Sequence, residues 1–137
     1  MSISKVFQTA LLFAATAGAS AANAEVVVVV HPSNSLASMS AEQVADVFLG
    51  KSTALAPVDQ PESSPVRGEF YQKVTGKDAA QVKALWTRLI FTGKATPPKE
   101  VASSADVKKA VAADAKAIGY IEKGAADGSV KVVFTTP

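Results

Sequence analysis

The sequence has no cysteine and only one histidine among its 137 residues. Without cysteine, the chain has no disulfide, no thiolate metal ligand and no cysteine nucleophile. One histidine is too few for a metal centre built from several imidazoles, so we expect no metal site and no cofactor. The net charge of +2 is too small to indicate a protein that binds nucleic acid.

The sequence also lacks the short motifs of common catalytic sites. After residue 24 it contains no Ser-x-x-Lys, Gly-x-Ser-x-Gly or His-Glu-x-x-His pattern, and no glycine-rich phosphate loop. A hydrolase remains an alternative only if the fold brings His31 next to Ser33, Ser35 or Ser64, because a serine nucleophile needs an adjacent base. We therefore predict a protein that is not an enzyme.

Residues 1–24 have the features of a secretory signal peptide. Lys5 supplies the positive start, an apolar stretch follows, and Ala22-Asn23-Ala24 has small residues at the positions that signal peptidase recognises. The alternative is an N-terminal anchor helix, although the apolar stretch is too short to span a bilayer. We expect residues 25–137 to be a periplasmic domain with no stable membrane insertion after signal cleavage.

Strand and helix patterns alternate along residues 25–137. The five valines of 26–30 are typical of a strand that is buried on both faces. Weaker strand patterns lie at 55–59, 117–121 and 130–134, and helix starts lie at Ser40, Ser63-Ser64, Asp78 and Ser103-Ser104. Strands separated by helices usually pair in parallel. We predict an α/β fold with a mostly parallel sheet of about four strands, flanked by about four helices. The last two strands are close enough in sequence to form a hairpin.

The start of the second predicted helix is the better candidate site, because ligands of open α/β sheets bind beyond the carboxyl ends of strands. Ser63 and Ser64 offer hydroxyl groups there, and Arg67 lies in the first turn. A helix N-terminus with an arginine suits an oxyanion. The alternative is structural: a serine caps the helix, and Arg67 pairs with Glu62 or Glu69.

A second polar segment follows the valine strand. It contains His31, Ser33 and Asn34, which we expect to line the rim of the same site together with Gln60. His31 could contact a ligand or change its charge near neutral pH, but it could equally be hydrogen-bonded structure. Trp86 lies on an apolar helical stripe, so we interpret it as a core residue and not as a binding platform.

Three segments resemble the phosphate-binding proteins of ABC transporters, and they occur in that family's order. Residues 40–51 resemble its helix followed by Ile/Val-Phe-x-Gly-Lys, and residues 63–70 resemble its Ser-Gly-Thr-Arg-x-x-Phe segment. Residues 117–121, Ala-Ile-Gly-Tyr-Ile, resemble its Ala-Ile-Gly-Tyr-Val strand. The resemblance implies one α/β lobe of the type 2 periplasmic binding protein fold, which captures an oxyanion in the periplasm.

The resemblance also implies roles for particular residues. Ser64 and Arg67 match the serine and the arginine of the family's motif. Pro65 stands in place of a glycine and Val66 in place of a threonine, while Gln60 stands where a further arginine would lie. One hydroxyl group and one positive charge are therefore missing. Family members have two lobes and about twice this length, so the chain resembles a single lobe.

We therefore expect an exported, non-catalytic solute-binding protein for phosphate or a related small oxyanion. Its partners would be that anion and an ABC transporter permease or another envelope protein. A single lobe cannot enclose a ligand from both sides, so a homodimer could build the cleft. The alternative is a protein-interaction module that docks on an envelope transporter or sensor without binding phosphate, and it predicts an exposed apolar patch.

Overall fold

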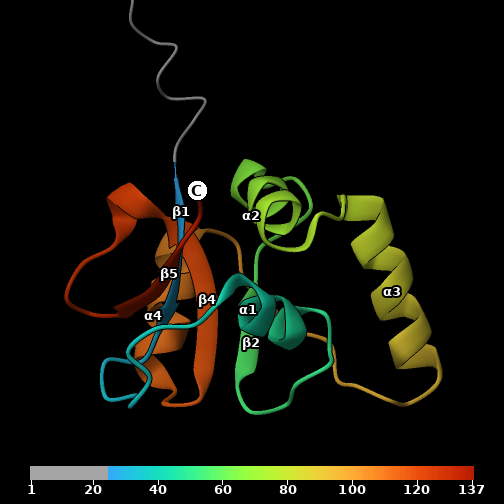
Figure 1. Ribbon diagram of the computed structural model, residues 1–137, viewed down its shortest axis with the longest axis horizontal. Helices are drawn as coiled ribbons and strands as arrows, with labels where there is room; N and C mark the ends of the chain where they lie inside the picture. The colour runs from blue at the N-terminus through green and yellow to red at the C-terminus, as the bar shows by residue number, and fades with distance from the viewer. Residues whose placement is uncertain (1–24) are drawn as a thin grey trace, which may run out of the picture.

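A five-stranded sheet forms the middle layer of the protein, with the strand order β3-β2-β4-β1-β5 (Figure 1). This computed structural model describes residues 25–137, so the predicted signal peptide lies outside the described residues. The strands are β1 (Val26–Val30), β2 (Ala56–Asp59), β3 (Lys99–Glu100), β4 (Ala117–Glu122) and β5 (Lys131–Thr135). The helices are α1 (Ala41–Phe48), α2 (Pro65–Thr75), α3 (Ala79–Phe91) and α4 (Ser104–Ala113), with a 3-10 turn at Lys123–Ala125. None of these helices has the length and hydropathy of a membrane span.

The strand β1 runs antiparallel to both of its neighbours. It pairs with β4 and β5 in this sense, whereas β2 pairs in parallel with β4 and β3. The predicted α/β class with four helices is confirmed, and the sheet proves to be mixed, with a fifth strand of two residues. The predicted hairpin of the last two strands is wrong, because β1 lies between β4 and β5. The segment that joins β4 to β5 instead crosses from one end of the sheet to the other.

The five valines of β1 are buried on both faces of the sheet, as predicted. Val26, Val28 and Val30 pack in a cluster with side chains of α1, α2 and α3. Val27 and Val29 pack in a second cluster with side chains of α4. The result is three layers: helices, sheet, and one further helix. A central strand in such a fold has no solvent face, which explains why its sequence shows no polar alternation.

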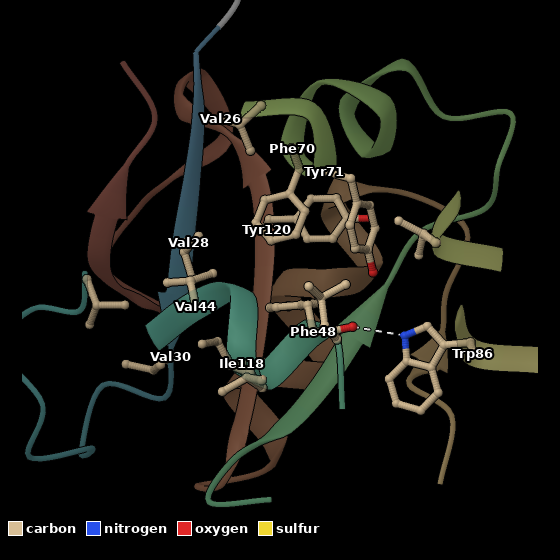
Figure 2. Close-up of a cluster of buried hydrophobic side chains, with 14 residues drawn as sticks. Val26, Val28, Val30, Val44, Phe48, Phe70, Tyr71, Trp86, Ile118 and Tyr120 are labelled. Atoms are coloured by element: carbon tan, nitrogen blue, oxygen red, sulfur yellow. Dashed lines mark hydrogen bonds between the residues drawn. The ribbon is translucent and has the colours of Figure 1, made fainter. Parts of the chain in front are cut away.

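Four aromatic rings fill the space between α1, α2 and β4 (Figure 2). Phe70 and Tyr120 stack with ring centroids 4.1 Å apart and an angle of 5° between their planes. Phe48 meets Phe70 edge-on at 4.8 Å, and Tyr71 completes the group. Each such pair contributes about 0.5–1.5 kcal/mol beyond the burial of apolar area. The rings therefore fix α2, and with it the candidate site segment, against the sheet.

The predicted capping residues begin α1 and α3. The Ser40 hydroxyl accepts from the Gln43 N–H, and the Gln43 side chain accepts in return from the Ser40 N–H. Asp78 and Gln81 form the same reciprocal pair at α3. Satisfying these N–H groups stabilises a helix start by about 1 kcal/mol. The helix α2 differs, because Ser64 precedes it but makes no capping hydrogen bond through its side chain.

The helix α3 lies outermost in Figure 1. Its buried residues, Val82 and Trp86, belong to the larger core cluster. The indole Nε1 of Trp86 donates to the carbonyl oxygen of Phe48 at 2.9 Å, as Figure 2 shows. Gly50 packs against Trp86 and Leu89, with a positive φ of 81°. Trp86 is 8% exposed and belongs to the larger core cluster, as the sequence predicts.

Candidate functional site

A buried carboxylate connects three elements at the carboxyl end of β2. Asp59, the last residue of β2, accepts at Oδ2 from the hydroxyl of Tyr71 at 2.7 Å. Its Oδ1 accepts from the N–H of Gln60 at 2.8 Å and from the hydroxyl of Tyr120. The Nε of Arg67 lies 3.7 Å from the same oxygen. Asp59 therefore holds β2, α2 and β4 together at the place where the sequence predicts a ligand site.

Both tyrosines act as hydrogen-bond donors to this carboxylate. Burial raises the pKa of Tyr71 and of Tyr120 far above the usual value for a phenol. The negative charge of Asp59 and the hydrogen bonds donated to it raise both pKa values further. The guanidinium of Arg67 lies over the Tyr71 ring, 5.4 Å from its centroid, and slightly lowers the Tyr71 pKa. The two hydroxyls therefore stay protonated throughout the physiological pH range.

Arg67 has an ion-pair partner, but its Nε has no hydrogen-bond partner. The 3.7 Å separation from Asp59 is too long for a hydrogen bond, and the Nε is buried. The side chain is 11% exposed. Among residues 25–137, Arg67 pairs with neither Glu62 nor Glu69, and Glu69 pairs instead with Lys73 at 2.9 Å. The structural alternative, in which Arg67 pairs with Glu62 or Glu69, is therefore wrong, and a nearly buried cation keeps an unused donor.

Arg67 and Asp59 border a hollow of about 390 Å³ between the start of α2, the helix α3 and the linker before β3. The apolar part of its lining comes from α3 and from the two linker prolines, and the charged residues come from β2, β3, the segment before α2, and the helices α2 and α3. The lining residues are Asp59, Glu62, Arg67, Val82, Lys83, Trp86, Thr87, Ile90, Pro97, Pro98 and Glu100. The hollow joins charged and apolar surfaces in one space, which is typical of small-molecule sites.

The other predicted residues of the α2 segment have different positions. Gln60 is 2% exposed, so the prediction that it lines a rim is wrong. Its side-chain nitrogen donates to the carbonyl oxygen of Tyr120 at 3.0 Å, and its oxygen accepts from the Ser64 hydroxyl at 2.9 Å. Ser63 is exposed. The amide of Gln60 therefore fixes Ser64 and β4, and it has no surface free for a ligand.

His31, Ser33 and Asn34 lie at the opposite end of the sheet from the start of α2. The antiparallel pairing of β1 places Val30 beside Ile118, near the beginning of β4. Figure 1 shows the loop after β1, in cyan, far from α2. The prediction that these three residues share a rim with the α2 segment is therefore wrong. It assumed that β1 runs parallel to its neighbours.

The fold does bring His31 next to one serine. The Oγ of Ser33 lies 2.8 Å from Nδ1 of His31, but the backbone N–H of Ser33 donates to that same nitrogen at 3.1 Å. The contact thus belongs to a turn between neighbouring residues. A catalytic base also needs a third group that orients its ring. Within residues 25–137 no such group is hydrogen-bonded to Nε2 of His31. The same residues contain no cluster of three or more acidic or histidine side chains that could hold a metal ion.

Comparison with known proteins gives a match in structure. No family model and no curated protein match the sequence. A protein assigned as a phosphate ABC transporter substrate-binding protein from Clostridium perfringens, solved with bound phosphate, has a TM-score of 0.65 and 23% identity. An ABC-type phosphate transport receptor from Vibrio cholerae has a TM-score of 0.63 and 22% identity. PstS from Borrelia burgdorferi has a TM-score of 0.62 and 13% identity.

Each comparison covers 80% of this chain, but only 45%, 46% and 47% of the respective structures. The chain therefore spans less than half the length of the proteins that it matches. The three segments that carry the sequence resemblance form α1 with the turn after it, the start of α2, and most of β4. The resemblance is confirmed at the level of the fold: the described chain has the fold of a single lobe of phosphate-transporter substrate-binding proteins.

Proposed function

We propose that this protein is a non-catalytic solute-binding protein that takes a small oxyanion, phosphate or a related one, beside Arg67. The observation that carries the proposal is a nearly buried guanidinium whose Nε has no acceptor. A buried charged donor without an acceptor is unfavourable, so Asp59 satisfies this guanidinium only in part. The Arg67 side chain also borders the hollow, and an oxyanion there would accept hydrogen bonds from its planar fork. Phosphate is the first choice because the proteins that share this fold are named as phosphate-binding.

The start of α2, which precedes Arg67 in the chain, offers further donors, although the hollow itself is lined by Arg67 and not by residues 63–66. The Ser64 side chain does not cap the helix, Pro65 has no N–H, and the N–H of Val66 lies in the first turn, where no intrahelical acceptor exists. The helix N-terminus carries a partial positive charge that favours an anion. Ser63 offers an exposed hydroxyl. We propose that the Ser63 hydroxyl and the Val66 N–H bind the anion together with Arg67. The Ser64 hydroxyl donates to Gln60 and therefore helps to position the segment.

Calorimetric titration of the purified protein with phosphate and sulfate tests the proposal. We expect binding that Arg67→Gln abolishes and that Arg67→Lys weakens, because lysine keeps the charge but loses the planar fork. Arg88→Gln is the matched control, because Arg88 is exposed on α3 and does not line the hollow. Circular dichroism checks that the variants fold. Absence of heat at millimolar phosphate, or equal binding by Arg67→Gln, would overturn the proposal.

We further propose that the protein is exported to the periplasm and that an ABC transporter permease or another envelope protein receives it there. The support is the signal-peptide pattern of residues 1–24 and the transport role named for the structures with this fold. Cell fractionation and N-terminal sequencing test export. We expect the mature chain to begin at Glu25 in the periplasmic fraction, and an intact Met1 in the cytoplasm would refute it.

A protein-interaction module is the second candidate function, and the exposed end of α3 favours it. Phe91 is 91% exposed and its neighbour Ile90 is 48% exposed. Adjacent exposed apolar residues are typical of contact surfaces. Sedimentation of the wild type and of Phe91→Ser at high concentration tests for a homodimer, and crosslinking in cells tests for an envelope partner. A monomer that crosslinks to no envelope protein would contradict this candidate.

A further inference from the structure

The hollow beside Arg67 has more room and more apolar surface than an inorganic oxyanion needs. Its volume of about 390 Å³ lies within the range of roughly 300–1,000 Å³ that is usual for pockets of organic ligands. We propose that the ligand is an organic oxyanion, with its anionic group at Arg67 and an apolar or aromatic body against α3. This inference rests on the proposed oxyanion-binding function and names the class of ligand.

The polar end of the hollow is rigid and holds one anionic group. Asp59 is fixed by the hydroxyls of Tyr71 and Tyr120, and Arg67 is held between Asp59 and the Tyr71 ring. A guanidinium that is held in place can meet a phosphate or carboxylate group through parallel hydrogen bonds. Because the partners of Asp59 are already in place, the ligand's anionic group does not have to displace them.

The charges around the hollow disfavour a bare dianion. The negative charge of Asp59 is offset by Arg67. Of the remaining lining residues, Glu62 and Glu100 are negative and only Lys83 is positive. A doubly charged inorganic phosphate therefore gains little electrostatic binding free energy from the charged residues around Arg67. A ligand that also buries apolar surface obtains binding free energy from a second source.

The apolar end of the hollow presents a surface that is already ordered. Trp86 lines it with its indole held by the bond to Phe48, in the orientation that Figure 2 shows. Pro97 and Pro98 have few rotatable bonds, so ordering them costs little side-chain entropy. Ile90 lines the hollow and is 48% exposed, so a ligand body placed here would remove apolar surface from water.

Titrations with inorganic phosphate, phenyl phosphate and benzyl alcohol, followed by calorimetry and tryptophan fluorescence, test the inference. The chain has one tryptophan, Trp86, so its emission reports directly on the hollow. We expect phenyl phosphate to bind about tenfold more tightly than inorganic phosphate and to change this emission. We expect much weaker binding of benzyl alcohol, which lacks the anionic group.

Two adjacent positions on α3 give a matched pair of variants. Ile90 lines the hollow, whereas its neighbour Phe91 does not. We expect Ile90→Ser to weaken phenyl phosphate binding severalfold and to leave phosphate binding unchanged. Phe91→Ser should change neither, whereas Arg67→Gln should abolish phosphate binding and weaken phenyl phosphate binding. Because both α3 side chains are exposed, neither serine variant should impair folding.

The outcomes separate this inference from the function on which it rests. Equal affinity for phosphate and phenyl phosphate, with no effect of Ile90→Ser, overturns the inference and leaves oxyanion binding standing. Binding of neither anion overturns both. Phenyl phosphate could also bind tightly but with the same affinity to the Arg67→Gln variant, or without changing the Trp86 emission. Either result would place the ligand elsewhere and overturn the inference.

Discussion

The hydroxyl of Tyr71 donates to Oδ2 of Asp59 at 2.7 Å, joining the middle of α2 to the end of β2. Tyr120 on β4 donates to Oδ1 of the same carboxylate. With the Gln60 N–H, these two hydroxyls satisfy the carboxylate of Asp59, a residue that is only 6% exposed. Arg67, at 3.7 Å, contributes charge but no hydrogen bond. The two tyrosines therefore leave the guanidinium free to bind another acceptor.

We expect the free energy of unfolding to fall as the pH rises above about 10, the usual tyrosine pKa. Burial and the charge of Asp59 raise the pKa of Tyr71 and Tyr120 in the folded state. Above pH 10 the unfolded chain loses phenol protons that the folded chain keeps, so alkali favours unfolding. The expected slope is about 1.4 kcal/mol per pH unit for each tyrosine. Urea unfolding between pH 8 and pH 12 measures it.

The comparison with Tyr120→Phe isolates the tyrosine contribution, because lysine titration affects both proteins equally. The chain has only these two tyrosines, so the variant keeps a single phenol. Its stability should be lower at neutral pH, since a bond to Asp59 is lost, but should fall less steeply in alkali. A slope equal to that of the wild type would contradict the raised pKa of Tyr120.

Removal of the Asp59 carboxylate should cost much more than removal of a surface ion pair. Asp59→Ala leaves two buried hydroxyls and the Arg67 guanidinium without their partner, so we expect a loss of about 3–5 kcal/mol. The matched control is Glu69→Ala, which breaks a more exposed pair with Lys73 and should cost less than about 1 kcal/mol. Urea denaturation measures both. Similar losses in the two variants would contradict the structural role of Asp59.

A double-mutant cycle shows whether Arg67 depends on Asp59. Adding Arg67→Met to Asp59→Ala removes the unpaired charge, so the double variant should be more stable than the sum of the two single losses predicts. Additive losses would mean that the 3.7 Å contact between the two side chains carries no coupling.

Much of the fold could be predicted because its elements depend on short sequence signals. Ser40 and Asp78 begin helices through hydrogen bonds with residues three positions later. The five consecutive valines of β1, with no polar residue among them, indicate a strand that is buried on both faces. The direction of β1 relative to β4 could not be predicted, because it depends on the path of the chain between distant segments. The two-residue β3 is too short to show any periodicity.

The candidate site could be predicted only in part. Arg67 and the start of α2 follow from a local motif, and both prove to lie at the end of β2. Asp59 is not among the residues predicted for the site. The signal that could have found it is an acidic residue at the end of an apolar strand, because a buried carboxylate must find donors. The sequence predicts Gln60 on the rim because it follows a strand and stands where the resemblance has a further arginine, yet position in the sequence does not show which way a side chain turns.

Gly119 is required by the close approach of β4 and α4. A Cβ atom at this position would overlap with Cγ1 of Val107. We expect Gly119→Ala to lower the free energy of unfolding by about 1–3 kcal/mol through overpacking. Gly124→Ala is the matched control, because nothing lies within 4 Å of the added atom. Adding Val107→Ala to Gly119→Ala should recover part of the loss, and equal stability of the two glycine variants would contradict the close contact.

Gly50 should be more sensitive to substitution than Gly76, although both have a positive φ, of 81° and 73°. Alanine at either position is destabilised by roughly 1–2 kcal/mol, because a side chain with a Cβ is strained in the left-handed backbone conformation. Only at Gly50 would the added Cβ also lie 2.8 Å from Cδ1 of Leu89 and 3.2 Å from the Trp86 indole. We therefore expect Gly50→Ala to cost about 1–3 kcal/mol more than Gly76→Ala.

The fluorescence of Trp86 distinguishes this local clash from a general loss of stability. If Gly50 holds α3 against α1, Gly50→Ala should displace the indole from its contact with the Phe48 carbonyl oxygen and shift its emission in the folded state. Gly76 lies at the end of α2, with nothing within 4 Å of an added Cβ. Gly76→Ala should therefore leave the emission unchanged. Identical spectra for the two variants would show that α3 does not depend on the contact at Gly50.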